Sequence, residues 1–117
     1  MNNSLVGKYL VSKWGYSMIL ATYVKVIRET PKTLVVQEVK SRHTTEEEDA
    51  KLGLSYGWLQ CYTVPTDNPE RHNGEEQKTF PVYKRDNGCY IGCTPGSNMK
   101  HYFYVWDGKP EFEDHCD

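Results

Sequence analysis

The fold of this chain is predicted most clearly by one C-terminal stretch, Lys100-His101-Tyr102-Phe103-Tyr104-Val105-Trp106-Asp107-Gly108-Lys109-Pro110-Glu111-Phe112-Glu113. Runs rich in aromatic and β-branched residues flank Asp107-Gly108. Asp-Gly is a strong hairpin signal, because a type I′ turn needs positive φ at both central residues and glycine has no Cβ to resist it. Pro110 lacks an N–H, which suits a strand start or a sheet edge. The stretch predicts a terminal β-hairpin, with Asp107 and Gly108 as its turn and Trp106 as its anchor.

Three segments of the N-terminal half predict an antiparallel meander. They are residues 5–14, 18–28 and 33–39, and Glu29-Thr30-Pro31-Lys32 has the composition of a turn between the last two. Side chains of the first segment alternate between two faces, with Tyr9, Val11 and Lys13 on one and Leu10, Ser12 and Trp14 on the other. Gly15 interrupts this strand, so we expect Trp14 to pack near a bend.

The middle of the chain alternates short strand-like runs with turn signals. In the acidic residues 44–52, Thr45 followed by Glu48 resembles a capping box, so a short helix over 45–52 and an exposed loop both remain open. Residues 55–64 and 89–93 have strand composition. We expect Pro65 to end the first of these runs, residues 66–77 to form a surface loop, and Pro81 to place residues 78–85 at a sheet edge.

Together these elements predict a single all-β domain over residues 1–117. The chain has 117 residues, which suits one domain with one hydrophobic core. Short strands separated by turn residues favour an antiparallel sheet that closes or nearly closes on itself, because closure removes exposed strand edges. The expected architecture is a small, partly open barrel or strongly bent sheet, SH3-like or OB-like in scale.

Composition excludes several classes of protein. The net charge is −2, so no global positive field attracts nucleic acid, although a local basic face is compatible with that total. No apolar run approaches the ~18 residues of a membrane span, and the first residues lack the blocks of a signal peptide. We therefore expect a cytoplasmic protein that does not enter a membrane, with its four cysteines reduced.

No motif in the chain predicts a catalytic centre, a metal site or a cofactor. Cys89, Cys93, His115 and Cys116 have soft ligand atoms, but their spacing is too loose for a zinc motif. The C-terminal acids are expected to be solvated, which leaves their pKa values untuned for catalysis; they are Glu111, Glu113, Asp114 and Asp117. A pocket in which His101 or His115 meets a cysteine or carboxylate would indicate a small-molecule binder or small enzyme instead.

Aromatic residues are the main candidates for a binding surface. Nine Tyr and three Trp occur in the chain, and the candidates among them are Trp14, Tyr16, Trp58, Tyr102 and Tyr104. Exposed, they would anchor a protein partner, or stack the bases of a single strand beside basic residues of the meander, Lys8, Lys13, Lys25, Arg28 and Lys32. Packing within the sheet is the expected role of Tyr102 and Tyr104.

Three stretches also carry a resemblance to a group of proteins. They are Val11-Ser12-Lys13-Trp14-Gly15-Tyr16-Ser17-Met18, the segment Tyr23 to Leu34, and Trp106-Asp107-Gly108-Lys109-Pro110. As a set they resemble small proteins encoded by bacteriophages, prophages and plasmids, with an S-x-WGY segment, a YKVV-like strand with a K-T-V partner, and a terminal WDGKP hairpin. Residues 41–98 are not covered, Met18-Ile19-Leu20-Ala21 departs from a more polar segment, and the cysteines lie outside the pattern.

The resemblance implies a context and no catalytic residues. A small accessory protein of a mobile element often engages a host component, which makes a host protein the expected partner. The leading hypothesis is a non-catalytic interaction protein in the cytoplasm of the host cell, including an anti-CRISPR-like inhibitor of a host defence nuclease. A barrel that binds single-stranded nucleic acid is the alternative, and a small-molecule binder or small enzyme is the second alternative.

Overall fold

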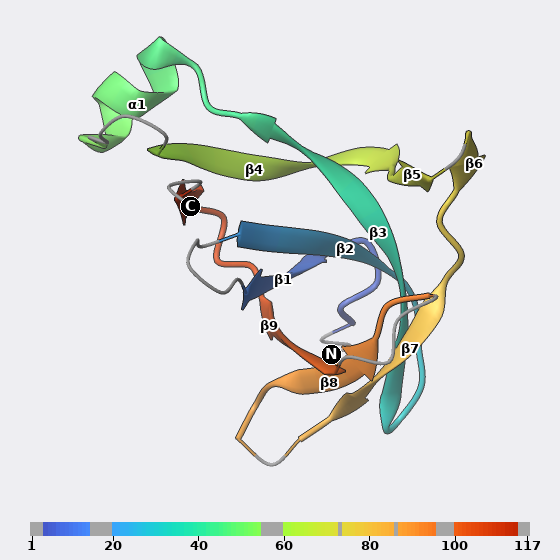
Figure 1. Ribbon diagram of the computed structural model, residues 1–117. Helices are drawn as coiled ribbons and strands as arrows, with labels where there is room; N and C mark the ends of the chain where they lie inside the picture. Colours follow the sequence, from blue (N-terminus) through green and yellow to red (C-terminus); the bar gives the residue numbers. More distant parts are fainter. Residues whose placement is uncertain are drawn as a thin grey trace.

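The computed structural model describes residues 4–14, 20–54, 60–72, 74–85, 87–95 and 100–114 of the chain (Figure 1). Strands dominate it, with one short helix after the third strand. The elements in chain order are β1 (Tyr9–Trp14), β2 (Leu20–Glu29), β3 (Thr33–His43), α1 (Glu46–Leu52), β4 (Gln60–Pro69), β5 (Arg71–His72), β6 (Glu75–Glu76), β7 (Phe80–Lys84), β8 (Tyr90–Cys93), β9 (Lys100–Val105) and β10 (Glu111–Asp114).

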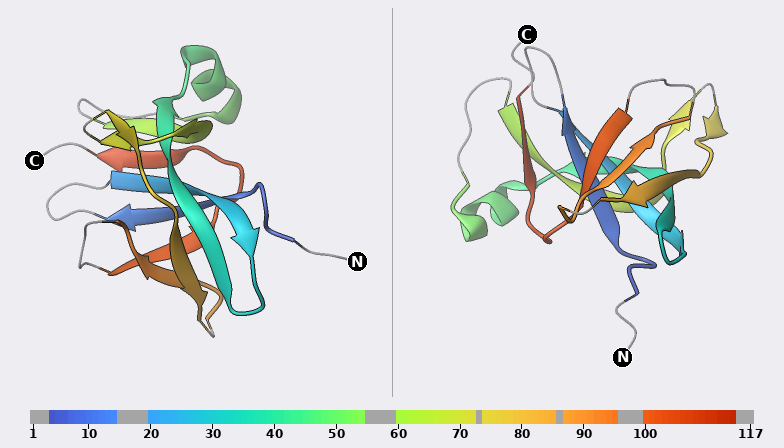
Figure 2. Two further views of the ribbon diagram at one scale, coloured as in Figure 1. Left: turned by 90° about the vertical axis from the view of Figure 1, so that its right-hand side faces the viewer. Right: turned by 90° about the horizontal axis from the view of Figure 1, so that it is seen from below.

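A closed antiparallel barrel forms the centre of the fold. The strand order is β10-β4-β3-β2-β1-β9-β8-β7, and a further pairing between β3 and β7 closes six of these strands into a ring (Figure 2). The predicted meander is present as β1, β2 and β3, each paired with the next. The all-β prediction is confirmed, and the barrel is closed where the sequence left it partly open.

The long strand β3 connects the barrel to the rest of the sheet. One edge of β3 pairs with β2, while the other pairs first with β7 over Thr33–Val36 and then with β4 from Val39 to His43. A single strand therefore belongs to the barrel at one end and to an added layer of β4 and β10 at the other. Figure 1 shows β3 running toward α1, away from the β7–β8 turn, and β4 starting on the side of α1 and running toward β5.

The barrel interior is filled by alternate side chains of its strands. In β1, Leu10 and Ser12 share one face, as the alternation predicted, and this face is buried in the interior, whereas Trp14 at the end of the strand is exposed. β-Branched residues on alternate positions fit a pleated sheet with one face in the core. The interior cluster consists of Leu10, Val24, Val26, Leu34, Val36, Phe80, Val82, Tyr90 and Phe103.

Strand β7 is not the edge strand that Pro81 suggested, since it pairs with β3 on one side and β8 on the other. The ladder with β8 includes only Tyr83 and Lys84, whereas Pro81 pairs with Val35 of β3. Further along, β8 passes very close to β7: a Cβ on Gly92 would lie 2.6 Å from the Pro81 carbonyl oxygen. Only glycine allows that approach, which holds the two strands together beyond their ladder.

The predicted terminal hairpin is wrong. Residues 107–109 do form a turn, in which the Lys109 N–H donates to Asp107 Oδ1 (2.9 Å) and Gly108 has φ +88°. However, β9 already has β1 and β8 on its two edges, so no edge is free for β10. The turn therefore carries the chain across to β4, with which β10 pairs.

The structure corrects the expected strand end at Pro65 and the expected surface loop over residues 66–77, and it decides between helix and loop for residues 45–52. Strand β4 continues through Pro65 to Pro69, because the ladder to β3 is irregular there and the Thr66 hydroxyl donates to the Lys40 carbonyl (2.8 Å). Residues 66–77 are thus largely strand, ending in the short β5–β6 pair. The helix alternative is confirmed as α1, with Thr45 and Glu48 forming the full capping box.

Candidate functional site

The barrel has two outer faces with similar aromatic content and different surroundings. We call the outer side of β1, β2 and β3 the covered face; its side chains are Tyr9, Val11, Tyr23, Val39 and Trp106. We call the outer side of β7, β8 and β9 the open face; its side chains are Tyr83, Ile91, Tyr102 and Tyr104. The contrast between them locates the candidate site.

Strands β4 and β10 lie over the covered face and supply hydrogen bonds to its tyrosines. The Tyr23 hydroxyl, which is buried, donates to the Thr63 carbonyl (2.8 Å), and Tyr9 donates to Asp67, which also pairs with Lys25 (3.0 Å). Burial, followed by the bond to Asp67, raises the pKa of Tyr9 to about 12. Burial also raises the pKa of Tyr23.

The covered face also contains a buried carboxylate. Glu113 of β10 is buried, contrary to the expectation that the C-terminal acids are solvated, and Thr63 donates its hydroxyl to Glu113 Oε2 (2.7 Å). Trp106 closes the layer by packing edge-on against Tyr9 (6.0 Å) and Tyr23 (6.4 Å), while its indole N–H donates to the Lys109 carbonyl (2.7 Å). Each polar group here has a partner, so this face is structural.

The open face presents its side chains to solvent in one continuous row. Tyr83 lies opposite Ile91 on the next strand, and Ile91 lies opposite Tyr102 on the strand after that. Tyr104 follows two residues later on β9 and lies opposite Val11. Tyr83, Tyr102 and Tyr104 are each 53% exposed, and no residue of the described chain forms a hydrogen bond with their hydroxyls.

Basic side chains surround one end of this row. A cavity of about 460 Å³ is lined by Lys84, Arg85, Asn87 and Tyr102. Another of about 520 Å³ lies around Tyr83 and is lined by Pro31, Lys32, Tyr83, Lys84, Arg85 and Gly88. A third, of about 400 Å³, is lined by Pro81, Tyr83, Ile91, Gly92, Cys93 and Lys100. Among the described residues no acidic side chain lines these three cavities.

The other end of the row has acidic neighbours. Tyr104 and Tyr102 line a cavity of about 520 Å³ together with Lys13, Asp107 and Glu111. Lys13 is already engaged there, with Glu111 (3.6 Å) and with the Phe112 carbonyl (2.6 Å). By contrast, Lys32, Lys84, Arg85 and Lys100 have no ion pair within the part of the chain that the structure describes. The open face is therefore graded in charge, from acidic beside Tyr104 to basic beside Tyr83.

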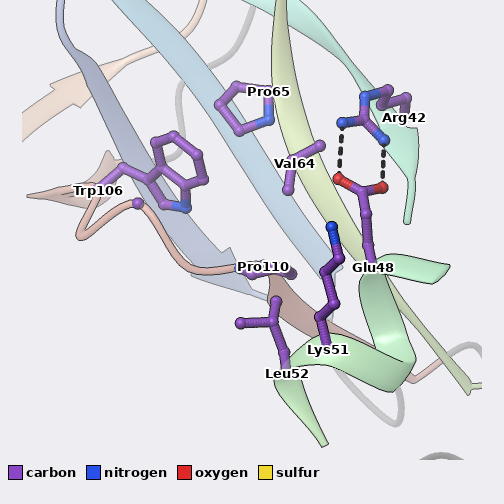
Figure 3. A pocket seen from close by; sticks show the side chains of 9 residues that line it. Arg42, Glu48, Lys51, Leu52, Val64, Pro65, Trp106 and Pro110 are labelled. Carbon is purple, nitrogen blue, oxygen red and sulfur yellow. Dashed lines mark hydrogen bonds and ion pairs between the residues drawn. The ribbon is translucent and has the colours of Figure 1, made fainter. Parts of the chain in front are cut away.

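A second concave region lies between α1, β4 and the 106–110 turn (Figure 3). This groove of about 460 Å³ is lined by Arg42, Glu48, Lys51, Leu52, Val64, Pro65, Trp106, Gly108 and Pro110. Its polar groups are paired within the protein: Arg42 forms a two-pronged bond with Glu48 (2.9 and 3.1 Å), and Lys51 lies 3.8 Å from Glu47. The bond from Arg42, together with the Thr45 N–H, lowers the pKa of Glu48 to about 2.

The residues singled out from the sequence separate into three groups. Tyr102 and Tyr104 lie together on the open face and are not packed within the sheet as expected. Trp14 is 43% exposed at the end of β1, where its indole N–H donates to Thr22 (2.6 Å) and its ring meets His101. Tyr16 and Trp58 lie outside the described residues.

Sequence reasoning missed the residues that complete the open face. Tyr83 and Ile91 were not selected, nor were Lys84 and Arg85, which line a cavity with Tyr102. Of the basic residues expected from the meander, Lys32 lines the Tyr83 cavity and Lys13 lines the cavity shared by the other two tyrosines. Lys25 pairs instead with Asp67 on the covered side of the barrel. The alternation of buried Phe80 and Val82 with exposed Pro81 and Tyr83 was the available signal.

Within the described part of the chain, Cys89, Cys93 and His101 do not come together as a metal site. Cys89 directly precedes β8 and Cys93 ends it, so they are about 13 Å apart at the usual strand rise. Cys89 is buried beside the Asn87 side chain (2.9 Å). His101 packs against the rings of Trp14 and Phe103. His115 and Cys116 lie outside the described residues.

Comparisons of the chain with models of known protein families, with curated proteins and with solved structures give no match. Within the described residues, no helix combines the length and apolar character that crossing a membrane requires.

Proposed function

We propose that this protein is a non-catalytic binding protein whose recognition surface is the open face. One observation carries the proposal: Tyr83, half-buried Ile91 and Tyr102 form a continuous row across three strands, in which both tyrosines are exposed and no described residue engages their hydroxyls. Tyrosine is enriched among residues that dominate binding energy, because it offers a large rigid surface with a polar tip. An exposed aromatic patch on a small domain indicates an interaction site.

The barrel suits this role because it fixes the row rigidly. The inward neighbours of these tyrosines on β7 and β9 are the buried residues Val82 and Phe103, so the outward side chains stand on a packed core. A recognition surface that is ordered before binding loses less conformational entropy when its partner arrives. The resemblance to proteins of mobile elements adds a host component as the partner, and interference with a host defence system as the biological result.

Capture from a bacterial lysate tests this proposal. The wild-type protein is compared with the double variant Tyr83→Ser/Tyr102→Ser and with Leu52→Ser, whose leucine is equally exposed but lies at the α1 groove. We expect one or more components to be retained by the wild type and by Leu52→Ser, and lost by the double variant. Loss with Leu52→Ser alone would move the recognition surface to the groove and overturn the proposal. Thermal unfolding of each variant shows that the barrel remains folded.

A further inference from the structure

We infer that the partner of the open face is a single-stranded nucleic acid, bound across Tyr102 and Tyr83 toward the β7–β8 turn. This inference rests on the proposed function, since it names the chemistry of the partner for the same surface. Unpaired bases stack on exposed aromatic rings, and a phosphate backbone follows nearby basic groups. The open face has exposed rings and basic side chains together, since each of the three cavities around Tyr83, Ile91 and Tyr102 contains a Lys or Arg. A protein partner would not require a basic side chain at each of these cavities.

The charge distribution carries the first step. The net charge of −2 conceals a separation of charge along the molecule. The acids Glu46, Glu47, Glu48 and Asp49 belong to α1, and Figure 1 shows that α1 and the β7–β8 turn lie at opposite ends of the molecule, as does the left view of Figure 2. The charges of the described residues therefore repel a polyanion at the α1 end and attract it at the β7–β8 end.

The cavities beside the tyrosines carry the second step. Tyr102 and Tyr83 each line a cavity that also contains both Lys84 and Arg85. Because the same two cations line a cavity with each ring, they can contact the phosphates of a strand whose bases stack on Tyr102 and Tyr83. Lys32 at the Tyr83 cavity and Lys100 beside Ile91 extend the basic rim. None of the four has an ion-pair partner among the described residues, so binding a phosphate breaks no ion pair observed there.

The width of the face supports single strands over duplexes. The row crosses three neighbouring strands, so two interstrand spacings of ~4.8 Å place Tyr83 and Tyr102 about 10 Å apart. Stacking on these rings needs bases that are not already stacked within a helix. A duplex presents only its phosphates to this surface, so it should bind through charge alone and more weakly.

Tyr104 provides a matched control on the same strand. It has the same exposure as Tyr102, and both line the cavity that contains Asp107 and Glu111, but only Tyr102 also lines a cavity with Lys84 and Arg85. A nucleic-acid strand that runs along Lys84 and Arg85 does not contact Tyr104. Removing the Tyr104 ring should therefore weaken binding less than removing the Tyr102 ring, although the two residues are equal in type and exposure.

The test measures binding of fluorescently labelled oligo-dT and oligo-U by anisotropy at several salt concentrations. We expect binding that weakens as salt rises, with a log–log slope reduced by about 0.7 for each cation removed in Lys84→Ala and Arg85→Ala. Tyr102→Leu should lower affinity by about tenfold or more. Tyr102→Phe, which keeps the ring, should bind like the wild type, and Tyr104→Leu should lose much less than Tyr102→Leu.

Several outcomes overturn the inference and separate its failure from that of the proposed function. Salt-independent binding, equal losses in Tyr102→Leu and Tyr104→Leu, or a duplex that binds as tightly as the single strand contradicts it. If the oligonucleotides do not bind, while the Tyr83→Ser/Tyr102→Ser variant loses a lysate component that survives nuclease treatment, the partner is a protein and only this inference fails. If that variant loses nothing from the lysate and the oligonucleotides do not bind, both proposals fail.

Discussion

The covered face and the open face lie on the same barrel and are built from similar residues, yet they differ in what lies over them. On the covered face, β4 and β10 give Tyr9 and Tyr23 hydrogen-bond partners and Trp106 fills the remaining space. On the open face, Tyr83 and Tyr102 have neither cover nor partner among the described residues. Aromatic content alone therefore does not distinguish structure from recognition; the surrounding polar groups do.

The largest difference between the faces should appear when a whole ring is removed. Tyr23→Ala deletes a buried ring and its hydrogen bond, so we expect the free energy of unfolding to fall by about 3–5 kcal/mol. Tyr102→Ala removes a half-exposed ring, which should cost no more than about 1 kcal/mol of cross-strand packing. Urea unfolding measures both, and equal losses would show that the open face also has a structural role.

A smaller but substantial effect is expected at Gly92, whose close approach to β7 brings the strands of the open face together. In Gly92→Ala, the new methyl group would meet the Pro81 carbonyl oxygen and a Val82 methyl (2.8 Å), so β7 and β8 must separate. Overpacking of this kind typically costs about 1–3 kcal/mol. Gly108→Ala is the comparison, because a Cβ there has open space and only the φ of +88° is strained. Calorimetry should show a lower melting temperature for Gly92→Ala than for Gly108→Ala, and the reverse order would show that the turn conformation matters more than the β7–β8 contact.

Removing a single tyrosine hydroxyl group from each face should change stability less than removing a whole ring. Tyr23→Phe leaves the buried Thr63 carbonyl without the bond that it receives at 2.8 Å, so we expect a loss of about 1–2 kcal/mol. Tyr102→Phe should leave stability unchanged, because its hydroxyl bonds to no described residue. Chemical denaturation of the two variants side by side tests this, and a comparable loss in Tyr102→Phe would contradict the assignment of a free hydroxyl.

The smallest expected effect concerns α1, at the end of the molecule opposite the basic cavities. Arg42 lowers the pKa of Glu48 from 4.5 to about 2 in the folded protein, so its contribution to stability is present above pH 4.5 and is lost as the pH falls toward 2. Glu48→Gln removes this titration. The difference in stability between the wild type and the variant should therefore shrink over the same range, as the wild type loses this contribution. An NMR titration of the Glu48 carboxyl group gives the pKa directly, and a value near 4.5 would contradict the expected shift.

Local features of the fold were accessible from the sequence. The alternation in residues 9–14 predicted which side chains share a face, and the Thr45–Glu48 pair indicated the α1 capping box. Features that depend on distant neighbours were not accessible. Asp107-Gly108 forms a turn as predicted, but the pairing of β10 depends on β1 and β8 already occupying both edges of β9.

The candidate site was only partly predictable for the same reason. Tyr102 and Tyr104 could be selected as exposed aromatic candidates, whereas Tyr83 and its basic neighbours lie about twenty residues away in the sequence and meet Tyr102 only through β8. Periodicity shows that two side chains share a face, but not whether another layer covers that face. Tyr9 and Tyr104 illustrate this, since both alternate outward from the barrel and only Tyr9 is covered.

The sequence by itself determined the class of fold, the strand faces and the helix cap, because these follow from backbone propensity and from contacts between residues near in the chain. The tertiary structure decided the closure of the barrel through β3 and β7, the crossing of the last strand to β4, and the separation of charge between α1 and the β7–β8 turn. These features join segments far apart in sequence. Their free energy comes from packing and pairing that no local pattern records.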